Sequence, residues 1–210
     1  RIDFSGFWCR GEMRTSKSSM TEAANRVVVL LQGYVDGDRA SGTVTLVTSR
    51  EGHVMLVDAG DPWNGEELKK KLEERGFAPD QVTDVVVTHG HVDHVGNLGL
   101  FQRAKFVMDG DWAKEGRYGQ REDRHYLSPS IWIEKRSGHT AADLIVVVKE
   151  EERGGAVVVA GDLFEDGEDE EKWRANSQLP EEQERSREYV RQLADWIVPG
   201  HGDVFQVEKR

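Results

Sequence analysis

A short stretch, T-H-G-H-V-D-H-V-G at Thr88–Gly96, concentrates side chains that bind metals. Three histidines and one aspartate fall within six residues of it. Neutral imidazole and carboxylate groups are ligands that zinc and similar divalent metals prefer. Gly90 and Gly96 supply tight turns around the cluster, which favours a metal site over a polar surface turn. The candidate ligands are His89, His91, Asp93 and His94.

Three further candidate ligands follow singly, at His139, Asp162 and His201. Each comes just after an apolar or strand-like run, and each is preceded by a glycine. Glycine lets the backbone turn sharply and come close to a metal centre. Any one of these residues alone is typical of an ordinary loop, but with the cluster they make seven ligands. The sequence therefore predicts a site for two divalent metal ions, with Zn²⁺ first and iron or manganese as alternatives.

Short β-branched runs bounded by turn residues predict the strands that would position these ligands. Most runs are near-continuous rather than alternating, which is typical of strands covered on both faces. Apolar periodicity predicts helices over Glu66–Arg75, over Pro180–Trp196 and from Asp93 through Leu98. This pattern favours an α/β fold in which helices cover two packed sheets. The predicted strands are Val27–Leu31, Thr43–Thr48, Val54–Val57, Val85–Thr88, Lys105–Met108, Ile131–Glu134, Leu144–Val148 and Ala156–Ala160.

Composition narrows the class of protein. A length of 210 residues favours one domain, which we place over residues 26–210, after a polar N-terminal tail at residues 1–25. No stretch approaches the roughly 20 apolar residues that span a bilayer, so no membrane insertion is expected. A net charge of −11 argues against a basic groove along a long phosphate backbone. The single cysteine, Cys9, favours a reducing compartment.

The combined motif resembles that of the metallo-β-lactamase superfamily. The match is H-x-H-x-D-H at His89–His94 and then one histidine, one aspartate and one histidine in family order, within about residues 26–207. The resemblance implies an αββα four-layer sandwich with the metal site at one edge of the two sheets. It also implies that His89, His91 and His139 hold the first metal, that Asp93, His94 and His201 hold the second, and that Asp162 bridges both. Asp58, in V-D-A-G, is implied as a support that orients a ligand.

A narrower resemblance is to a group of animal members of this superfamily. It rests on V-V-V-L-L-Q-G-Y at residues 27–34, on Thr88–Phe101 and on Val157–Gly167, whereas Lys105–Arg136 shows little match. That group is described as endoribonucleases that process the 3′ ends of histone pre-mRNA. The resemblance implies an RNA substrate, a homodimer, and a cytoplasmic and also nuclear localisation.

Such a site predicts a hydrolase in which a metal-bridging hydroxide attacks phosphorus or a carbonyl carbon. Two divalent cations, offset by Asp93, Asp162 and one hydroxide, leave a charge of about +1 that attracts anionic substrates. We expect Asp93 and Asp162 to be the catalytic carboxylates, with Asp93 orienting the hydroxide or accepting its proton. Aromatic residues near the ligand turns are the candidate walls of a substrate pocket: Tyr34, Trp63 and Phe164.

Two other functions would use the same ligands. One is a glyoxalase II-like thioesterase or lactonase that acts on a small molecule. The other is an oxidoreductase with a single iron, for which His89, His139 and Asp162 are ligands of the type used by relatives with this scaffold. The acidic run Glu165–Glu171 is predicted to be a solvated loop, because like charges repel and stay hydrated.

Overall fold

The structure, a computed structural model, describes residues 24–209. Its larger sheet has seven strands in the order β1-β4-β5-β6-β7-β8-β9. β5 runs parallel to β6, and β6 runs parallel to β7, while the other neighbours in this sheet are antiparallel. The strands are β1 (Arg26–Leu31), β4 (Val44–Thr48), β5 (Val54–Val57), β6 (Asp84–Val87), β7 (Lys105–Met108), β8 (Asp111–Lys114) and β9 (Arg117–Gln120).

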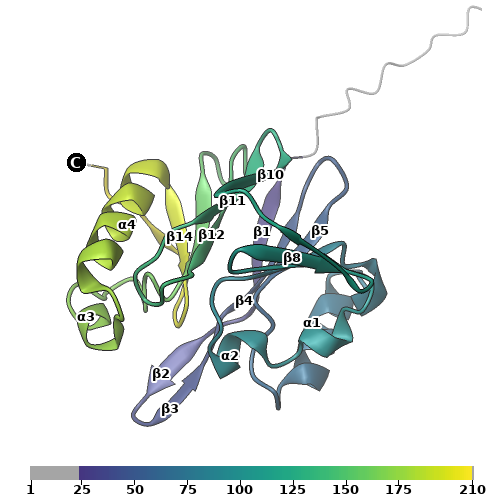
Figure 1. Cartoon of the computed structure of the whole chain (residues 1–210), viewed down its shortest axis with the longest axis horizontal. Helices are drawn as coiled ribbons and strands as arrows, with labels where there is room; N and C mark the ends of the chain where they lie inside the picture. Colours follow the sequence, from purple (N-terminus) through teal and green to yellow (C-terminus); the bar gives the residue numbers. More distant parts are fainter. Residues whose placement is uncertain (1–23, 210) are drawn as a thin grey trace, which may run out of the picture.

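The second sheet has six strands in the order β10-β11-β12-β13-β14-β15. Its strands β13 and β14 are parallel and the others pair antiparallel. Figure 1 shows the two sheets side by side, with the later part of the chain in green to yellow. The strands are β10 (Arg124–Ser128), β11 (Ile131–Lys135), β12 (Leu144–Val148), β13 (Val157–Gly161), β14 (Trp196–Pro199) and β15 (Phe205–Gln206).

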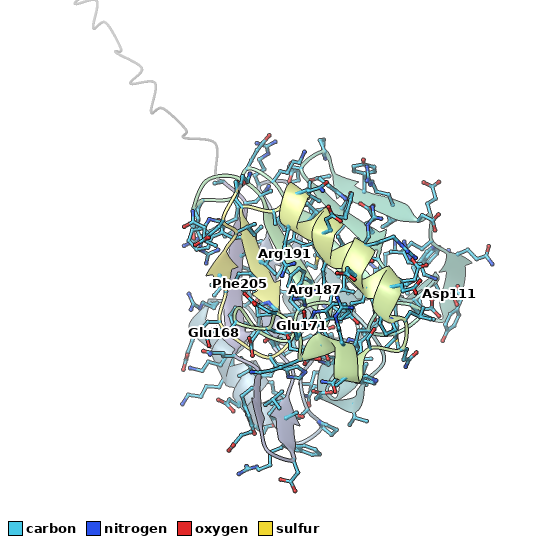
Figure 2. The ribbon with its side chains drawn as sticks, turned by 90° about the vertical axis from the view of Figure 1, so that its left-hand side faces the viewer. Asp111, Glu168, Glu171, Arg187, Arg191 and Phe205 are labelled. Carbon is cyan, nitrogen blue, oxygen red and sulfur yellow. The ribbon has the colours of Figure 1, made fainter. Side chains whose placement is uncertain are left out.

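Helices cover the outer face of each sheet. The first sheet carries α1 (Gly65–Glu74), with α2 (Val92–Val95) and the short 3-10 turns η1 (Pro79–Gln81) and η2 (Leu98–Leu100) nearby. The second carries α3 (Trp173–Asn176) and α4 (Pro180–Leu193), and Figure 2 looks directly onto α4 as it crosses that sheet. Within residues 24–209, no helix is long and apolar enough to cross a membrane.

Alternation along the strands builds a core on both faces of each sheet. In the first sheet Val57 and Val86 pack between the sheets, whereas their neighbours Leu56 and Val85 pack against α1. In the second sheet Val146, Val148 and Val159 face the same central layer, and the alternate positions face α4. Because successive strand residues point to opposite faces, fully apolar strands need cover on both sides. The predicted αββα sandwich is confirmed.

The α1 and α4 helices show how the sequence sets their extent. Leu68 and Leu72, four residues apart, are the buried stripe of α1, and Gly76 follows it with φ +85°. Pro180 starts α4, as predicted, but the helix ends at Leu193 rather than at Trp196. Trp196 instead begins β14, which pairs in parallel with β13, so the predicted C-terminal end of this helix is wrong.

Other parts of the fold differ from the expected elements. The hairpin of β2 (Tyr34–Asp36) and β3 (Arg39–Ser41) was not predicted, nor were β8, β9 and β10. These strands are short and largely polar or exposed, so they lack the apolar pattern on which the prediction rested. Asn25 is buried and its amide donates to Ser130 and to the Lys149 carbonyl, so it belongs to the domain, not to the tail. Cys9 and residues 1–23 lie outside the described residues.

Candidate metal centre

The candidate ligands lie at the carboxyl ends of strands from both sheets. His89 follows β6 by two residues, Asp162 follows β13 directly, and His201 follows β14 by two residues. His139 lies in the loop between β11 and β12, and the Leu144 amide that opens β12 donates to the Thr88 carbonyl at 2.8 Å. This bond ties the edges of the two sheets together beside the site. Parallel strands end at the same edge, which is why these distant residues meet.

One group of donors comprises three histidines and the shared aspartate. His91 Nδ1 lies 2.9 Å from His89 Nε2 and 3.0 Å from His139 Nε2. Asp162 Oδ2 lies 3.5 Å from His89 Nε2 and 3.4 Å from His139 Nε2. His89, His139 and Asp162 are buried, while His91 is exposed at the mouth. These are the residues that the resemblance assigned to the first metal, together with its bridge.

A second group of donors lies on the other side of Asp162. His94 Nε2 is 3.2 Å from Asp162 Oδ1, and His201 Nε2 is 3.2 Å from Asp162 Oδ2. Asp93 Oδ2 lies 3.7 Å from His94 Nε2 and 3.8 Å from His201 Nε2. The structure thus brings all seven predicted ligands together, with Asp162 in contact with both groups, as expected of a bridging residue.

These donors fit divalent cations. In a tetrahedral zinc site with metal–nitrogen bonds of about 2.0–2.1 Å, two nitrogens lie about 3.3 Å apart, close to the separations seen here. His94 Nε2 and Asp162 Oδ1 are fully buried and lie 3.2 Å apart, yet neither makes a hydrogen bond with the described residues. Buried polar atoms without partners are rare in folded proteins, and here they face other ligand atoms. A cation would satisfy them.

Asp58 supports the cluster from behind, in the role that the resemblance implied. Its Oδ2 contacts His94 Nδ1 at 2.8 Å, so His94 presents Nε2 to the site. Its two oxygens also accept hydrogen bonds from the Thr88 amide and hydroxyl, each at 2.7 Å. The backbone of Asp58 has φ +64°, a conformation that few non-glycine residues adopt. That geometry turns the chain at the end of β5 and aims the carboxylate at the ligands.

Four of the histidines have shifted pKa values, and the shifts have opposite directions in the two groups. Burial lowers the pKa of His89 to about 2, and burial also lowers the pKa of His139. For His94, burial opposes the charge, but Asp162 and Asp58 raise its pKa well above the ordinary value. Against the same burial, Asp162 raises the pKa of His201 to about 9. The neutral imidazoles of His89 and His139 are ready to bind a cation, whereas His94 and His201 must release protons.

Glycines let the ligand loops approach one another. A Cβ at Gly200 would overlap Asp162 Oδ1, and Gly161 has φ +54° with its missing Cβ directed at Thr88. Both positions therefore need glycine, as the sequence suggested.

The three predicted pocket walls have different placements. Tyr34 and Trp63 are 44% and 78% exposed. Tyr34 pairs with Ser41, whose carbonyl contacts His201 Nδ1, and the Ser41 hydroxyl donates to Asp61, two residues before Trp63. Both aromatic residues therefore belong to segments beside the second ligand group. Phe164 is 1% exposed and packs in the core under α4, so it does not form a pocket wall.

The acidic run Glu165–Glu171 is not uniformly solvated. Glu165 and Asp169 are buried, and Glu165 Oε2 lies 3.9 Å from His201 Nε2. Burial, followed by the charge of Asp162, raises the pKa of Glu165. The sequence-based expectation missed this residue, although its position three residues after Asp162 was a usable signal. The prediction of a solvated loop is wrong for these two side chains.

Comparisons with known proteins agree with this geometry. The family model described as "Metallo-beta-lactamase superfamily" matches residues 37–131. The chain is 40% identical over 203 residues to the Metallo-beta-lactamase domain-containing protein 1 of Xenopus laevis, covering 91% of this chain and 86% of that protein. The chain belongs to the metallo-β-lactamase superfamily.

Solved structures show the same superfamily fold at low sequence identity. A putative metallo-beta-lactamase from Thermotoga maritima matches with a TM-score of 0.69 at 18% identity, covering 88% of this chain and 100% of that one. AidC, a dizinc quorum-quenching lactonase, matches with a TM-score of 0.64 at 16% identity, covering 81% of this chain and 76% of that one. This chain is thus a hydrolase of the metallo-β-lactamase superfamily with a His/Asp cluster suited to divalent metals.

Proposed function

We propose that this protein is a dinuclear metal-dependent endoribonuclease that cleaves phosphodiester bonds in single-stranded RNA, including the 3′ ends of histone pre-mRNA. The convergence of seven donors around the shared Asp162 supports the two-metal part. The sequence likeness of Thr88–Phe101 and Val157–Gly167 to the animal endoribonucleases supports the RNA part.

Different residues of the site would hold the cations and activate the attacking water. Divalent cations held here would supply a nucleophile at neutral pH and stabilise the negative charge that develops on the phosphoryl oxygens. His89, His91 and His139 would hold one cation, and His94 and His201 the other, with Asp162 between them. The Asp93 side chain is 21% exposed and lies at the mouth of the second group. Its carboxylate can orient the attacking water and accept its proton.

Access and stacking also support a polymer substrate. His91 is exposed and Asp93 partly exposed, so one side of the cluster opens to solvent. Tyr34 and Trp63 present aromatic rings from the segments around Ser41, close to the second ligand group. Stacking of a base on an aromatic ring contributes about 1–3 kcal/mol. With a net charge of −11, binding would depend on the cations and on stacking rather than on a basic groove.

A second candidate is hydrolysis of a small lactone or thioester. It is favoured by the shared fold with AidC, which is a lactonase. Cations held by the same donors would stabilise the negative charge that develops on a carbonyl oxygen. An iron-dependent oxidoreductase is the third candidate, because His89, His139 and Asp162 form part of one donor group.

The proposed function is tested by measuring the metal content of the purified protein and its activity on alternative substrates. We expect about two divalent ions per chain in protein purified without chelator, and cleavage of a single-stranded histone 3′-end RNA and a phosphodiester reporter. His91→Ala should abolish cleavage, while the control His53→Ala, on a histidine that contacts Asp84 away from the site, should keep it. Turnover of a thioester or lactone without RNA cleavage would contradict the RNA assignment. One iron and no zinc per chain would favour oxidation chemistry.

The homodimer and the cytoplasmic and nuclear localisation remain part of this proposal. Sedimentation of the purified protein tests the dimer, and imaging of the tagged full-length chain tests the localisation.

A further inference from the structure

Glu165 is a buried carboxylate at the edge of the metal centre that the seven-ligand motif does not include. It lies three residues after Asp162, at the carboxyl end of β13, and is 6% exposed. Its backbone carbonyl accepts a hydrogen bond from the His201 amide at 2.8 Å, while the Gly200 amide donates to the Phe164 carbonyl at 2.9 Å. Two successive backbone bonds therefore fix Glu165 against the loop that carries the last ligand.

The two carboxylate oxygens of Glu165 have different surroundings. Oε1 accepts a hydrogen bond from Asn176 Nδ2 at 3.0 Å. Oε2 faces His201 Nε2 at 3.9 Å, and no lysine or arginine nitrogen in residues 24–209 lies within 4.0 Å of this carboxylate. Removing a carboxylate from water costs several kcal/mol unless a positive charge compensates it. The protein thus holds one oxygen in place and leaves the other directed toward the second ligand group.

We propose that Glu165 is an eighth donor of the metal centre, which binds the second cation together with His201 and Asp162. The inference rests on the metal site of the proposed function but not on its RNA substrate.

The separations between the donors fit a shared cation. Ligand atoms of Asp162, Glu165 and His201 all lie within 4.8 Å of one another. Two donors on one ion, each bonded at about 2.0–2.2 Å, are separated by at most about 4.3 Å, which accommodates the 3.9 Å between Glu165 and His201. Asp162 Oδ1 and His94 Nε2 are both buried and lie 3.2 Å apart, yet neither makes a hydrogen bond among the described residues, and this is the independent sign that a ligand belongs in the cluster.

An eighth donor changes the charge of the centre. Three carboxylates, those of Asp93, Asp162 and Glu165, would then face the two cations. With two divalent cations and one bound hydroxide, the net charge of the centre would then be zero instead of +1. A neutral centre attracts distant anions less strongly. The second position would also have more oxygen donors than the first, since the first group has three histidines and one aspartate.

The test is the affinity of metal-free protein for Zn²⁺, measured by competition with a chromophoric chelator. Glu165→Gln keeps the side-chain shape and an oxygen for Asn176 but removes the charge. We expect the second equivalent of Zn²⁺ to bind about 10–100-fold more weakly, with the first equivalent unchanged. The matched control is Glu168→Gln, on an exposed glutamate of the same segment, which should bind both equivalents like the wild type.

Two results would overturn the proposal: wild-type affinity for both equivalents in Glu165→Gln, or equal weakening of both, which indicates a purely structural role. If Glu165→Gln does not fold, Asn176→Ala replaces it, because Asn176 is exposed and its loss only frees Oε1. Weaker binding of the second equivalent in Asn176→Ala supports the role of Glu165, and unchanged binding refutes it. This readout uses no substrate, so a failure to cleave RNA leaves it unaffected.

Discussion

Two buried polar clusters lie past the carboxyl end of β13, one at α4 and one in the metal centre, and they differ in whether their hydrogen bonds are complete. At α4, Arg187 donates to the Leu163 carbonyl at 2.6 Å and to both the carbonyl and carboxylate of Asp169. Its guanidinium lies 4.3 Å from the Phe164 ring and 4.9 Å from the Trp173 ring. In the metal centre, His94 Nε2 and Asp162 Oδ1 lie 3.2 Å apart, but neither makes a hydrogen bond among the described residues.

This difference in hydrogen bonding distinguishes a cluster that stabilises the fold from a cluster that binds a ligand. A buried charge with a paired carboxylate and several acceptors contributes to a single packed arrangement. Buried donors and acceptors without partners lower stability, so they persist where a ligand completes them. In Figure 2, α4, which carries Arg187 and Arg191, lies on the side of the molecule that faces the viewer. Each cluster includes a buried aspartate from the same stretch, Asp162 in the metal centre and Asp169 beside Arg187, so chemical type alone does not tell them apart.

Asp162→Asn should give the largest effect, because it removes the carboxylate that both metal groups share. We expect kcat/KM on a phosphodiester reporter to fall by at least about a thousandfold, since metal ions contribute several kcal/mol of transition-state stabilisation. Zn²⁺ at 100 times its Kd should stabilise the wild type by about 2.7 kcal/mol per site, and this gain should shrink in the variant. Thermal melts with and without Zn²⁺ measure it. Full turnover retained in both Asp162→Asn and His91→Ala would rule out the two-metal mechanism.

Arg187→Met should lower the stability of the metal-free protein and leave its additional stabilisation by Zn²⁺ unchanged. Removing the arginine leaves Asp169 buried without its ion pair, which costs about 3–5 kcal/mol of unfolding free energy. Urea unfolding of metal-free protein measures this loss, and the additional stability conferred by Zn²⁺ should remain. Arg185→Met, on an exposed arginine of the same helix that pairs with Glu182, is the control and should change stability by less than about 1 kcal/mol. A loss of Zn²⁺ stabilisation in Arg187→Met would show that the clusters are not independent.

Asp143 is a buried carboxylate whose charge is only partly compensated by hydrogen bonds. It gives a smaller, pH-dependent test of the same comparison. Thr140 donates its hydroxyl and amide to the Asp143 carboxylate, but burial still raises the Asp143 pKa to about 6. Between the unfolded value of 3.8 and about 6 the folded state holds more protons, so this group's contribution to stability falls as pH rises through that window. In metal-free protein, the stability of the wild type relative to Asp143→Asn should therefore fall by up to about 3 kcal/mol between pH 4 and pH 7. A constant difference across urea titrations at these pH values would contradict the burial of a charged Asp143.

The ligand set was predictable because its signal is local. His89, His91, Asp93 and His94 fall within six residues, and Gly138, Gly161 and Gly200 mark the single ligands that follow. Their positions after apolar runs also predicted that they would meet at strand ends. The structure brings them together across both sheets.

What the sequence did not reveal depends on contacts between distant segments. β14 follows α4 without a clear break, and it becomes a strand because Trp196–Pro199 pairs with β13. Glu165 looked like one acid among several in a polar run, and its burial depends on Asn176 and on the His201 loop. The Trp196-Ile197-Val198 run before Pro199 was the available sign of a strand. For Phe164, aromatic type near a ligand indicated a pocket wall, but the turn that follows β13 directs the ring into the core under α4.

The bond between the Leu144 amide and the Thr88 carbonyl joins sheet edges that belong to the two halves of the chain. The donors around it do the same, since His89–His94 come from the first half and His139, Asp162 and His201 from the second. A cation bound between them is therefore a reversible cross-link across the polypeptide, in a region where no covalent bridge joins the halves. Protease cleavage in the exposed turn at residues 115–116, between β8 and β9, should leave two fragments that stay associated while the cross-link is loaded and separate more readily when a chelator removes it.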